Sequence, residues 1–297
     1  MSTIAPAPAR TAASVTVGTG PLTIDDVVAV ARHGASLVLD PAALEGVAAS
    51  RAIVEGLAAD PEPHYGISTG FGALATTFIA EDRRAQLQAS LVRSHAAGSG
   101  AEVEREVVRA LMLLRLSTLM TGRTGVRRAT AETYAAILNA GITPVVREYG
   151  SLGCSGDLAP LAHCALVAMG EGEVRVSLLP EPTDAATALA AAGITPLRLG
   201  EKEGLALING TDGMLGMLAL AIDDLRRLLT TADVAAAMSV EGLLGTDAVF
   251  AEDLHALRPQ RGQAISASNL RRRAPAASSA ASRRPARGCT PGCGGLP

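Results

Sequence analysis

Apolar side chains recur at intervals of three and four residues over most of the chain, and this spacing predicts a mainly helical protein. An apolar helix is also expected after Pro160, behind a glycine-rich turn. Short extended segments are predicted at residues 15–17 and 171–179. The remaining helices are predicted at residues 24–33, 41–59, 81–97, 101–120, 127–140, 185–192, 213–229 and 231–244.

Turn-forming residues set the predicted boundaries of several helices. Thr23 precedes two acidic residues and is placed to cap a helix, and Asp40 is a second N-cap, followed by Pro41. Gly34 and Gly141 follow helical patterns and are expected to end them. These signals predict separate helices of ordinary length, joined by short connections.

Composition supports a helical core and excludes several classes of partner. Hydrophobic residues make up 48% of the chain, aromatic residues only 2%, and Trp is absent. Leu, Val, Ile and Ala must therefore fill the core, and a chain rich in alanine and poor in aromatic residues favours helix over sheet. The net charge of -3 gives no indication of nucleic acid or of an acidic membrane as a partner.

Targeting and redox signals point to a cytoplasmic protein. Residues 1–18 lack an apolar run, so we expect a flexible arm and no signal peptide. The most apolar stretch, residues 205–222, contains Asn209, Thr211 and Asp212, which argue against a membrane span. The spacing of the cysteines suggests neither a disulfide framework nor a zinc site, so a reduced compartment is expected. They are Cys154, Cys164, Cys289 and Cys293.

A glycine-rich turn at residues 149–157 carries the most distinctive candidate chemistry. Its centre is Cys154-Ser155-Gly156, and Asp157 is placed to cap the helix that follows. Taken alone, the pattern allows either a plain turn or a nucleophile on a strained turn, with Cys154 or Ser155 as the nucleophile.

Four segments, taken in their order along the chain, point to one protein family. They are Tyr65-Gly66-Ile67-Ser68-Thr69-Gly70-Phe71-Gly72, Ser94-His95-Ala96-Ala97-Gly98, Gly153-Cys154-Ser155-Gly156-Asp157-Leu158-Ala159-Pro160 and Glu203-Gly204-Leu205-Ala206-Leu207-Ile208-Asn209-Gly210-Thr211. Together they resemble the aromatic amino acid lyase family, and the resemblance extends over about residues 15–270. The Ser94-His95 pair resembles the histidine ammonia-lyases within that family, and the cysteine form of the tripeptide resembles the actinobacterial ones.

The resemblance implies a cofactor made from the chain itself. In this family a tripeptide cyclises to 4-methylidene-imidazol-5-one (MIO), and here it would be Cys154, Ser155 and Gly156. The usual first residue is Ala, but cyclisation uses only the carbonyl of that residue, so Cys154 is acceptable. Ser155 loses its hydroxyl to give the exocyclic methylidene, and Gly156 lets the backbone bend until its nitrogen reaches the carbonyl.

The resemblance also implies roles for individual side chains. Tyr65 would be the general base for the β-proton of the substrate, Asn209 would bind the cofactor oxygen, and His95 would line the substrate pocket. A structural hydrogen bond for Tyr65, a helix cap for Asn209 and a helix-terminal position for His95 remain the alternatives. His163 is interpreted as structural. The other histidines have no ligand-like spacing, so no metal site is predicted.

The resemblance implies a mainly α fold, an MIO-bearing domain followed by the start of a long-helix bundle. The predicted organisation is a flexible arm at 1–18, the MIO domain at 19–200, an incomplete bundle at 201–270 and a disordered basic tail at 271–297. No acidic residue follows Asp253, and we interpret the tail as translation in a shifted frame. The second half of the family's fold, with its carboxylate-binding and imidazole-binding residues, is expected to be missing.

Three functions remain open at this point. The first is elimination of ammonia from L-histidine to give urocanate, by an intact enzyme expected to be a homotetramer, with impaired activity in this chain. The second is a tyrosine ammonia-lyase or an MIO-dependent tyrosine aminomutase. The third is an inactive, non-catalytic remnant. A nucleic-acid-binding role for the basic tail is a more distant possibility.

Overall fold

A computed structural model describes residues 14–153, 156–176 and 181–273, so Cys154 and Ser155 lie outside the described residues. The chain divides into two compact units, one up to Asp223 and one from Asp224 onward. Helices dominate both, which confirms the prediction of a mainly helical fold.

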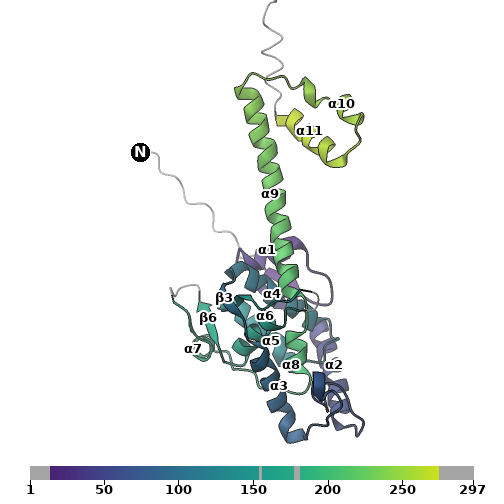
Figure 1. The fold of residues 1–297 in the computed structure, drawn as a ribbon, viewed down its shortest axis with the longest axis vertical. Coiled ribbons are helices and arrows are strands. Elements are labelled where there is room, and N and C mark those ends of the chain that lie inside the picture. Colours follow the sequence, from purple (N-terminus) through teal and green to yellow (C-terminus); the bar gives the residue numbers. More distant parts are fainter. Residues whose placement is uncertain (1–13, 154–155, 177–180, 274–297) are drawn as a thin grey trace, which may run out of the picture. The chain divides into compact units, whose positions relative to one another are not determined.

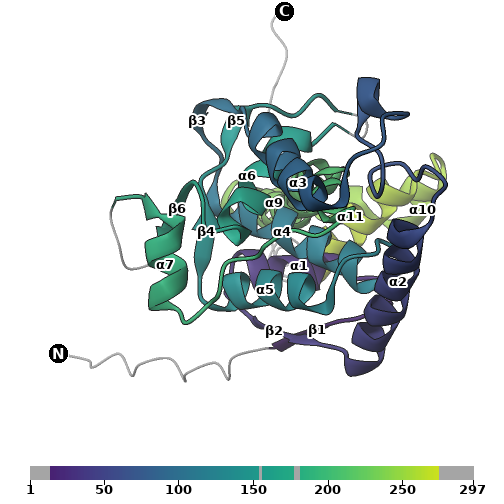
Figure 2. The same ribbon diagram turned by 90° about the horizontal axis from the view of Figure 1, so that it is seen from below.

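Helix α4 lies at the centre of the first unit, in contact with α1, α2, α5 and α6 (Figures 1 and 2). Its buried side chains include Leu113, Leu116 and Leu119, none of which is exposed to solvent. Burial of these aliphatic groups stabilises the unit. The helices are α1 (Ile24–Ala31), α2 (Pro41–Ala59), α3 (Glu81–His95), α4 (Arg105–Met120), α5 (Arg128–Asn139), α6 (Leu158–Ala168), α7 (Ala185–Ala191), α8 (Glu203–Ile208) and α9 (Asp212–Gly242), with a 3-10 turn, η1 (Gly72–Leu74).

Short strands surround the helices of the first unit and form small sheets. Strands β1 and β2 pair in parallel, β3 and β5 pair antiparallel, and β6 lies between β4 and β7 in an antiparallel sheet. They are β1 (Ser14–Val17), β2 (Ser36–Leu39), β3 (Ser99–Glu102), β4 (Ile142–Pro144), β5 (Arg147–Tyr149), β6 (Glu173–Val176) and β7 (Thr183–Asp184).

The helix ends predicted from Thr23, Gly34, Asp40 and Gly141 are confirmed. Thr23 and Asp26 form a reciprocal capping box at the start of α1, and the Asp40 side chain accepts from the amide of Ala42 at the start of α2. Gly34 and Gly141 adopt φ values of 68° and 70°, the left-handed conformation that ends a helix at little cost.

The predicted helix at 101–120 was wrong at its beginning. Residues Ser99–Glu102 form strand β3, and α4 begins only at Arg105. Gly100 has φ of 89°, and a Cβ atom there would lie 2.6 Å from Cδ2 of Tyr149 in β5. Close approach of a partner strand therefore overrides the helical propensity of the local sequence.

The two helices predicted at 213–229 and 231–244 are one continuous helix, α9. The apparent break falls at Thr230 and Thr231, which favour caps and turns because their hydroxyls compete for backbone groups. Here both hydroxyls donate to carbonyls four residues earlier, at 3.0 and 2.9 Å, so they are satisfied inside the helix.

The second unit contains the remainder of α9, the 3-10 turn η2 (Ala248–Phe250), α10 (Glu252–Ala256) and α11 (Arg261–Arg273). The Asp233 carboxylate on α9 accepts hydrogen bonds from Ser266 and, at 2.6 Å, from Asn269, both on α11. Helix α11 runs past the predicted start of the basic tail at Arg271. The rest of that tail, residues 274–297, lies outside the described residues.

By length and composition, the segment Glu203–Gly242 is apolar enough to cross a membrane. A core helix of a soluble protein passes the same test. The segment is also interrupted between α8 and α9, at residues 209–211. It is therefore weak support for a membrane span.

Candidate active site

Leu152 and Gly153 lie close to Gly156, the last residue of the predicted cofactor tripeptide. The amide of Leu152 donates to the carbonyl of Gly156 at 3.1 Å. A Cβ atom at position 156 would lie 2.2 Å from the carbonyl oxygen of Gly153, a separation that no side chain tolerates. Position 156 therefore requires glycine.

Asp157 does not cap the helix it precedes, contrary to the sequence prediction. It occupies the N-cap position of α6 without a side-chain hydrogen bond to that helix. Its fully buried carboxylate instead accepts from the Ser151 hydroxyl at 2.5 Å and from the amides of Gly213 and Met214 at 2.9 and 3.0 Å. Asp157 therefore fastens the turn to the start of α9, where free backbone amides favour a negative charge.

Asn209 ends helix α8 beside the same turn. The backbone amide of Asp157 donates to the carbonyl of Gly210 at 3.3 Å, which joins the tripeptide turn to the segment that carries Asn209. The Asn209 residue itself is exposed, and its backbone carbonyl accepts from Nη2 of Arg115 at 3.1 Å. Gly156 and Asn209 thus lie next to two residues that are joined by a backbone hydrogen bond.

A buried ion pair lies next to the segment that carries Asn209. Arg115 on α4 pairs with Asp212 at the start of α9, and both side chains are less than a tenth exposed. Burial raises the pKa of Asp212, and the Arg115 guanidinium opposes that rise. A second Arg115 nitrogen, Nη1, donates to the carbonyl of Ala206 in α8 at 3.0 Å.

Tyr65 lies in the loop at residues 64–72, with half of its surface exposed. Its hydroxyl accepts from the amide of Gly72 at 3.3 Å, and its ring meets Phe71 edge to face, with the centroids 5.9 Å apart. Gly66 has φ of 71°, and a Cβ there would lie 2.7 Å from the Phe71 ring. These contacts hold Tyr65 at the surface of a closed loop, with its ring accessible.

His95 is the last residue of α3. Its Nδ1 lies 2.8 Å from the carbonyl of Leu91 and 3.0 Å from the Ser94 hydroxyl. A carbonyl can only accept, so Nδ1 carries a hydrogen, and Nε2 is the nitrogen that can accept in the corresponding tautomer.

His163 has the structural position that the sequence predicted. Its Nε2 accepts from the amide of Gly98 at 3.1 Å, which ties the segment after His95 to helix α6. Burial lowers the pKa of His163, and the nearby charge of Arg147 lowers it further, so the neutral ring is favoured.

Three buried residues whose roles the sequence did not predict hold these motifs in place. Besides Arg115, they are Gln88 on α3 and Glu203 on α8. The Glu203 carboxylate is buried. It accepts hydrogen bonds from the backbone amide and Nε of Arg127, at 2.9 and 3.0 Å, and from the backbone amide of Gly200, at 2.8 Å. Glu203 opens the fourth motif, whereas Arg115 stands out only as a charged residue in the apolar run from Leu111 to Leu119.

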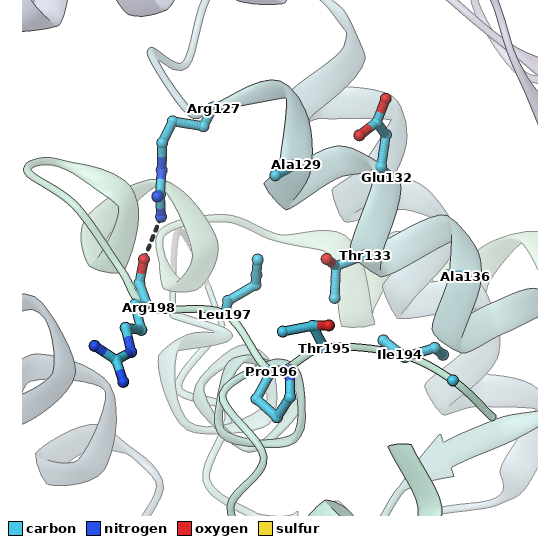
Figure 3. Close-up of a pocket in the computed structure, with 11 residues that line it drawn as sticks. Arg127, Ala129, Glu132, Thr133, Ala136, Ile194, Thr195, Pro196, Leu197 and Arg198 are labelled. Carbon is cyan, nitrogen blue, oxygen red and sulfur yellow. Dashed lines mark hydrogen bonds between the residues drawn. The ribbon is translucent and has the colours of Figure 1, made fainter. Parts of the chain in front are cut away.

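A pocket of about 530 Å³ lies elsewhere, between α5 and residues 193–198 (Figure 3). Arg127 at its rim donates to the carbonyl of Arg198, and Thr133, Ile194 and Leu197 line its interior. Neither Tyr65, His95, Gly156 nor Asn209 is among its lining residues. Over residues 14–153, 156–176 and 181–273, no group of three or more His, Cys, Asp or Glu side chains is placed to hold a metal ion.

Comparison with known proteins identifies the family of the chain. The profile of the aromatic amino acid lyase family matches residues 22–289. The histidine ammonia-lyase of Streptomyces griseus is 63% identical over 261 residues, which are 87% of this chain and 50% of that protein. The chain spans about half the length of the curated relatives it matches.

Solved structures show the same fold at lower identity. The histidine ammonia-lyase from Trypanosoma cruzi superposes with a TM-score of 0.80 at 36% identity, over 87% of this chain and 49% of that one. A tyrosine aminomutase from Streptomyces globisporus gives 0.81 at 38% identity, over 87% and 48%. By sequence and by fold, this chain belongs to the MIO-dependent aromatic amino acid lyase family.

Proposed function

We propose that the intact form of this protein is a histidine ammonia-lyase, which eliminates ammonia from L-histidine without oxidation and releases urocanate. The observation that carries the proposal is the pair of contacts that Asp157, the residue after Gly156, makes with residues 210 and 213, just after Asn209. The name of the Streptomyces griseus relative, at 63% identity, favours histidine as the substrate. Urocanate is an intermediate of histidine degradation, so the protein would act in that catabolic route.

Cys154, Ser155 and Gly156 are proposed to form MIO. When present, this group supplies the electrophile that a poor amine leaving group requires. Tyr65, accessible at the surface of its loop, would take the β-proton of the substrate. The exposed Asn209 amide would donate to the cofactor oxygen, and Nε2 of His95 would accept a hydrogen bond from the substrate imidazole.

A tyrosine-directed activity is the second candidate. The observation that favours it is the similarity to the tyrosine aminomutase from Streptomyces globisporus, at 38% identity and a TM-score of 0.81. The histidine-directed proposal has the more similar relatives. Analysis of the products from L-histidine and L-tyrosine separates the two activities.

The remaining expectations concern the whole protein. We propose a cytoplasmic homotetramer that acts on a small molecule and binds neither nucleic acid nor membrane. Because the chain spans about half of its relatives, we propose that it has low activity when it is expressed alone. If the chain has no activity at all, it is an inactive remnant.

The test is the absorbance of urocanate after L-histidine is added to the purified chain, with Ser155→Ala as the control. Product that disappears in Ser155→Ala supports the proposed reaction. Intact mass provides a second measurement, because cyclisation of the tripeptide removes two water molecules and Ser155→Ala blocks it. An unmodified mass together with absent product would refute catalysis by this chain.

A further inference from the structure

Gln88 lies where two of the site segments meet. It is on α3, seven residues before His95, and only 1% of its surface is exposed. Helix α3 packs against α8, the helix that ends at Asn209. A buried amide of this kind is costly unless both its donor and its acceptor are satisfied.

Both ends of the Gln88 amide are satisfied by backbone groups of the two segments. Nε2 donates to the carbonyl of Gly66, the residue after Tyr65, at 3.1 Å. Oε1 accepts from the amide of Gly204, in the first turn of α8, at 2.9 Å. That amide has no partner within its own helix, because the first turn of any helix leaves its N–H groups free.

Gln88 approaches α8 so closely that position 204 requires glycine. A Cβ atom at Gly204 would lie 2.9 Å from both the carbonyl oxygen and Oε1 of Gln88. A Cβ at Gly66 would lie 3.6 Å from Leu205 in α8. The Gly66 carbonyl also accepts from the amide of Lys202 at 3.1 Å, so this one carbonyl is bonded to the start of α8 both directly and through Gln88.

We propose that Gln88 is a positioning residue that couples the loop bearing Tyr65 to the helix bearing Asn209. The inference rests on the proposed function, because it gives Tyr65 and Asn209 their roles. Gln88 contacts neither substrate nor cofactor in this scheme; it fixes the separation of the two groups that do. A small displacement of either group costs catalysis far more than binding.

The side chain that best tests this coupling is glutamate. A carboxylate has the shape of the amide but cannot donate to the Gly66 carbonyl, whereas a protonated carboxyl can donate there and still accept from Gly204. Gln88→Glu should therefore break the coupling near neutral pH and restore it in acid. Gln86→Glu is the matched control, since Gln86 is on the same helix and is exposed.

Hydrogen exchange of the full chain provides a readout that needs no catalysis. At pH 7.5 we expect Gln88→Glu to lose about tenfold of its amide protection, relative to the parent chain, in both residues 64–72 and 202–208. At pH 5 that protection should return. Gln86→Glu should match the parent at both pH values. Because this control keeps Tyr65, Lys202 and Glu203, which lie near Gln88, any effect of their titration would appear in it as well.

Two results would overturn the coupling: loss of protection in one segment alone, or an equal loss across the whole chain. If Gln88→Glu does not fold, Gln88→Met replaces it, with the same paired loss expected at both pH values and no recovery in acid. In a parent chain that forms urocanate, kcat should fall at least tenfold in Gln88→Glu with KM nearly unchanged. If the parent forms none while the exchange pattern holds, the proposed activity fails for this chain and the coupling stands.

Discussion

Tyr134 is a residue whose hydroxyl has no stabilising role that the described structure reveals. The side chain is fully buried on α5, and its hydroxyl has no hydrogen-bond partner among the described residues. Because an unsatisfied buried hydroxyl costs free energy, Tyr134→Phe should leave the free energy of unfolding unchanged or raise it by about 1 kcal/mol. Urea denaturation measures the change, and the exposed Tyr149→Phe is the control. A loss of more than about 1 kcal/mol would contradict the prediction, because it would reveal a hydrogen bond to that hydroxyl.

His163 links single-residue chemistry to the pH dependence of stability. Burial and the charge of Arg147 lower its pKa in the folded state below the ordinary value of 6.5. The unfolded chain then binds a proton before the folded chain does, so the free energy of unfolding falls as the pH drops through 6.5. His163→Gln keeps an acceptor for the amide of Gly98 but cannot titrate, so its stability should fall less between pH 7 and pH 5. Denaturation curves at both pH values test this, and equal losses in parent and variant would refute it.

At the scale of helices and strands, local signals predicted the boundaries and missed the contacts that override them. The capping residues Thr23 and Asp40 are confirmed because an N-cap acts on amides two or three residues away. Strand β3 was missed because its partner β5 lies more than forty residues further along the chain. Asp157 was expected to cap α6 and instead binds the amides of α9, 56 residues further on. Sequence spacing alone carries no information about that choice.

The position of Asp157 leads to a prediction about helix α9. Asp157→Ala removes a buried carboxylate that accepts from two backbone amides and from the Ser151 hydroxyl. The free energy of unfolding should fall by about 2 kcal/mol, the upper end for the loss of a helix cap. Asp184→Ala, which removes an exposed cap from α7, is the control and should cost less. Equal losses in the two variants would show that the Asp157 contacts add nothing beyond an ordinary cap.

At the scale of the whole molecule, the order of the four motifs predicted the family, and family membership is confirmed. What the order could not predict is how the motifs are held together. That depends on Gln88, Arg115 and Glu203, which join segments from 22 to 116 residues apart in the sequence. The roles of Tyr65, His95 and Asn209 stay predictions until they are measured.

Helix α9 carries the last prediction, which concerns association of the chain. Leu215 and Leu218 are each about half exposed, and the same helix continues with further exposed leucines at positions 225, 228 and 229. Large apolar side chains that recur on one helix are unfavourable in water, so the purified chain should self-associate at micromolar concentration. Leu215→Glu with Leu218→Glu should reduce the associated fraction measured by light scattering, whereas Ile53→Glu, at an exposed site on α2, should leave it unchanged. A monodisperse monomer of the parent chain would show that these leucines do not drive association, and an equal effect of Ile53→Glu would mean that added charge alone explains the change.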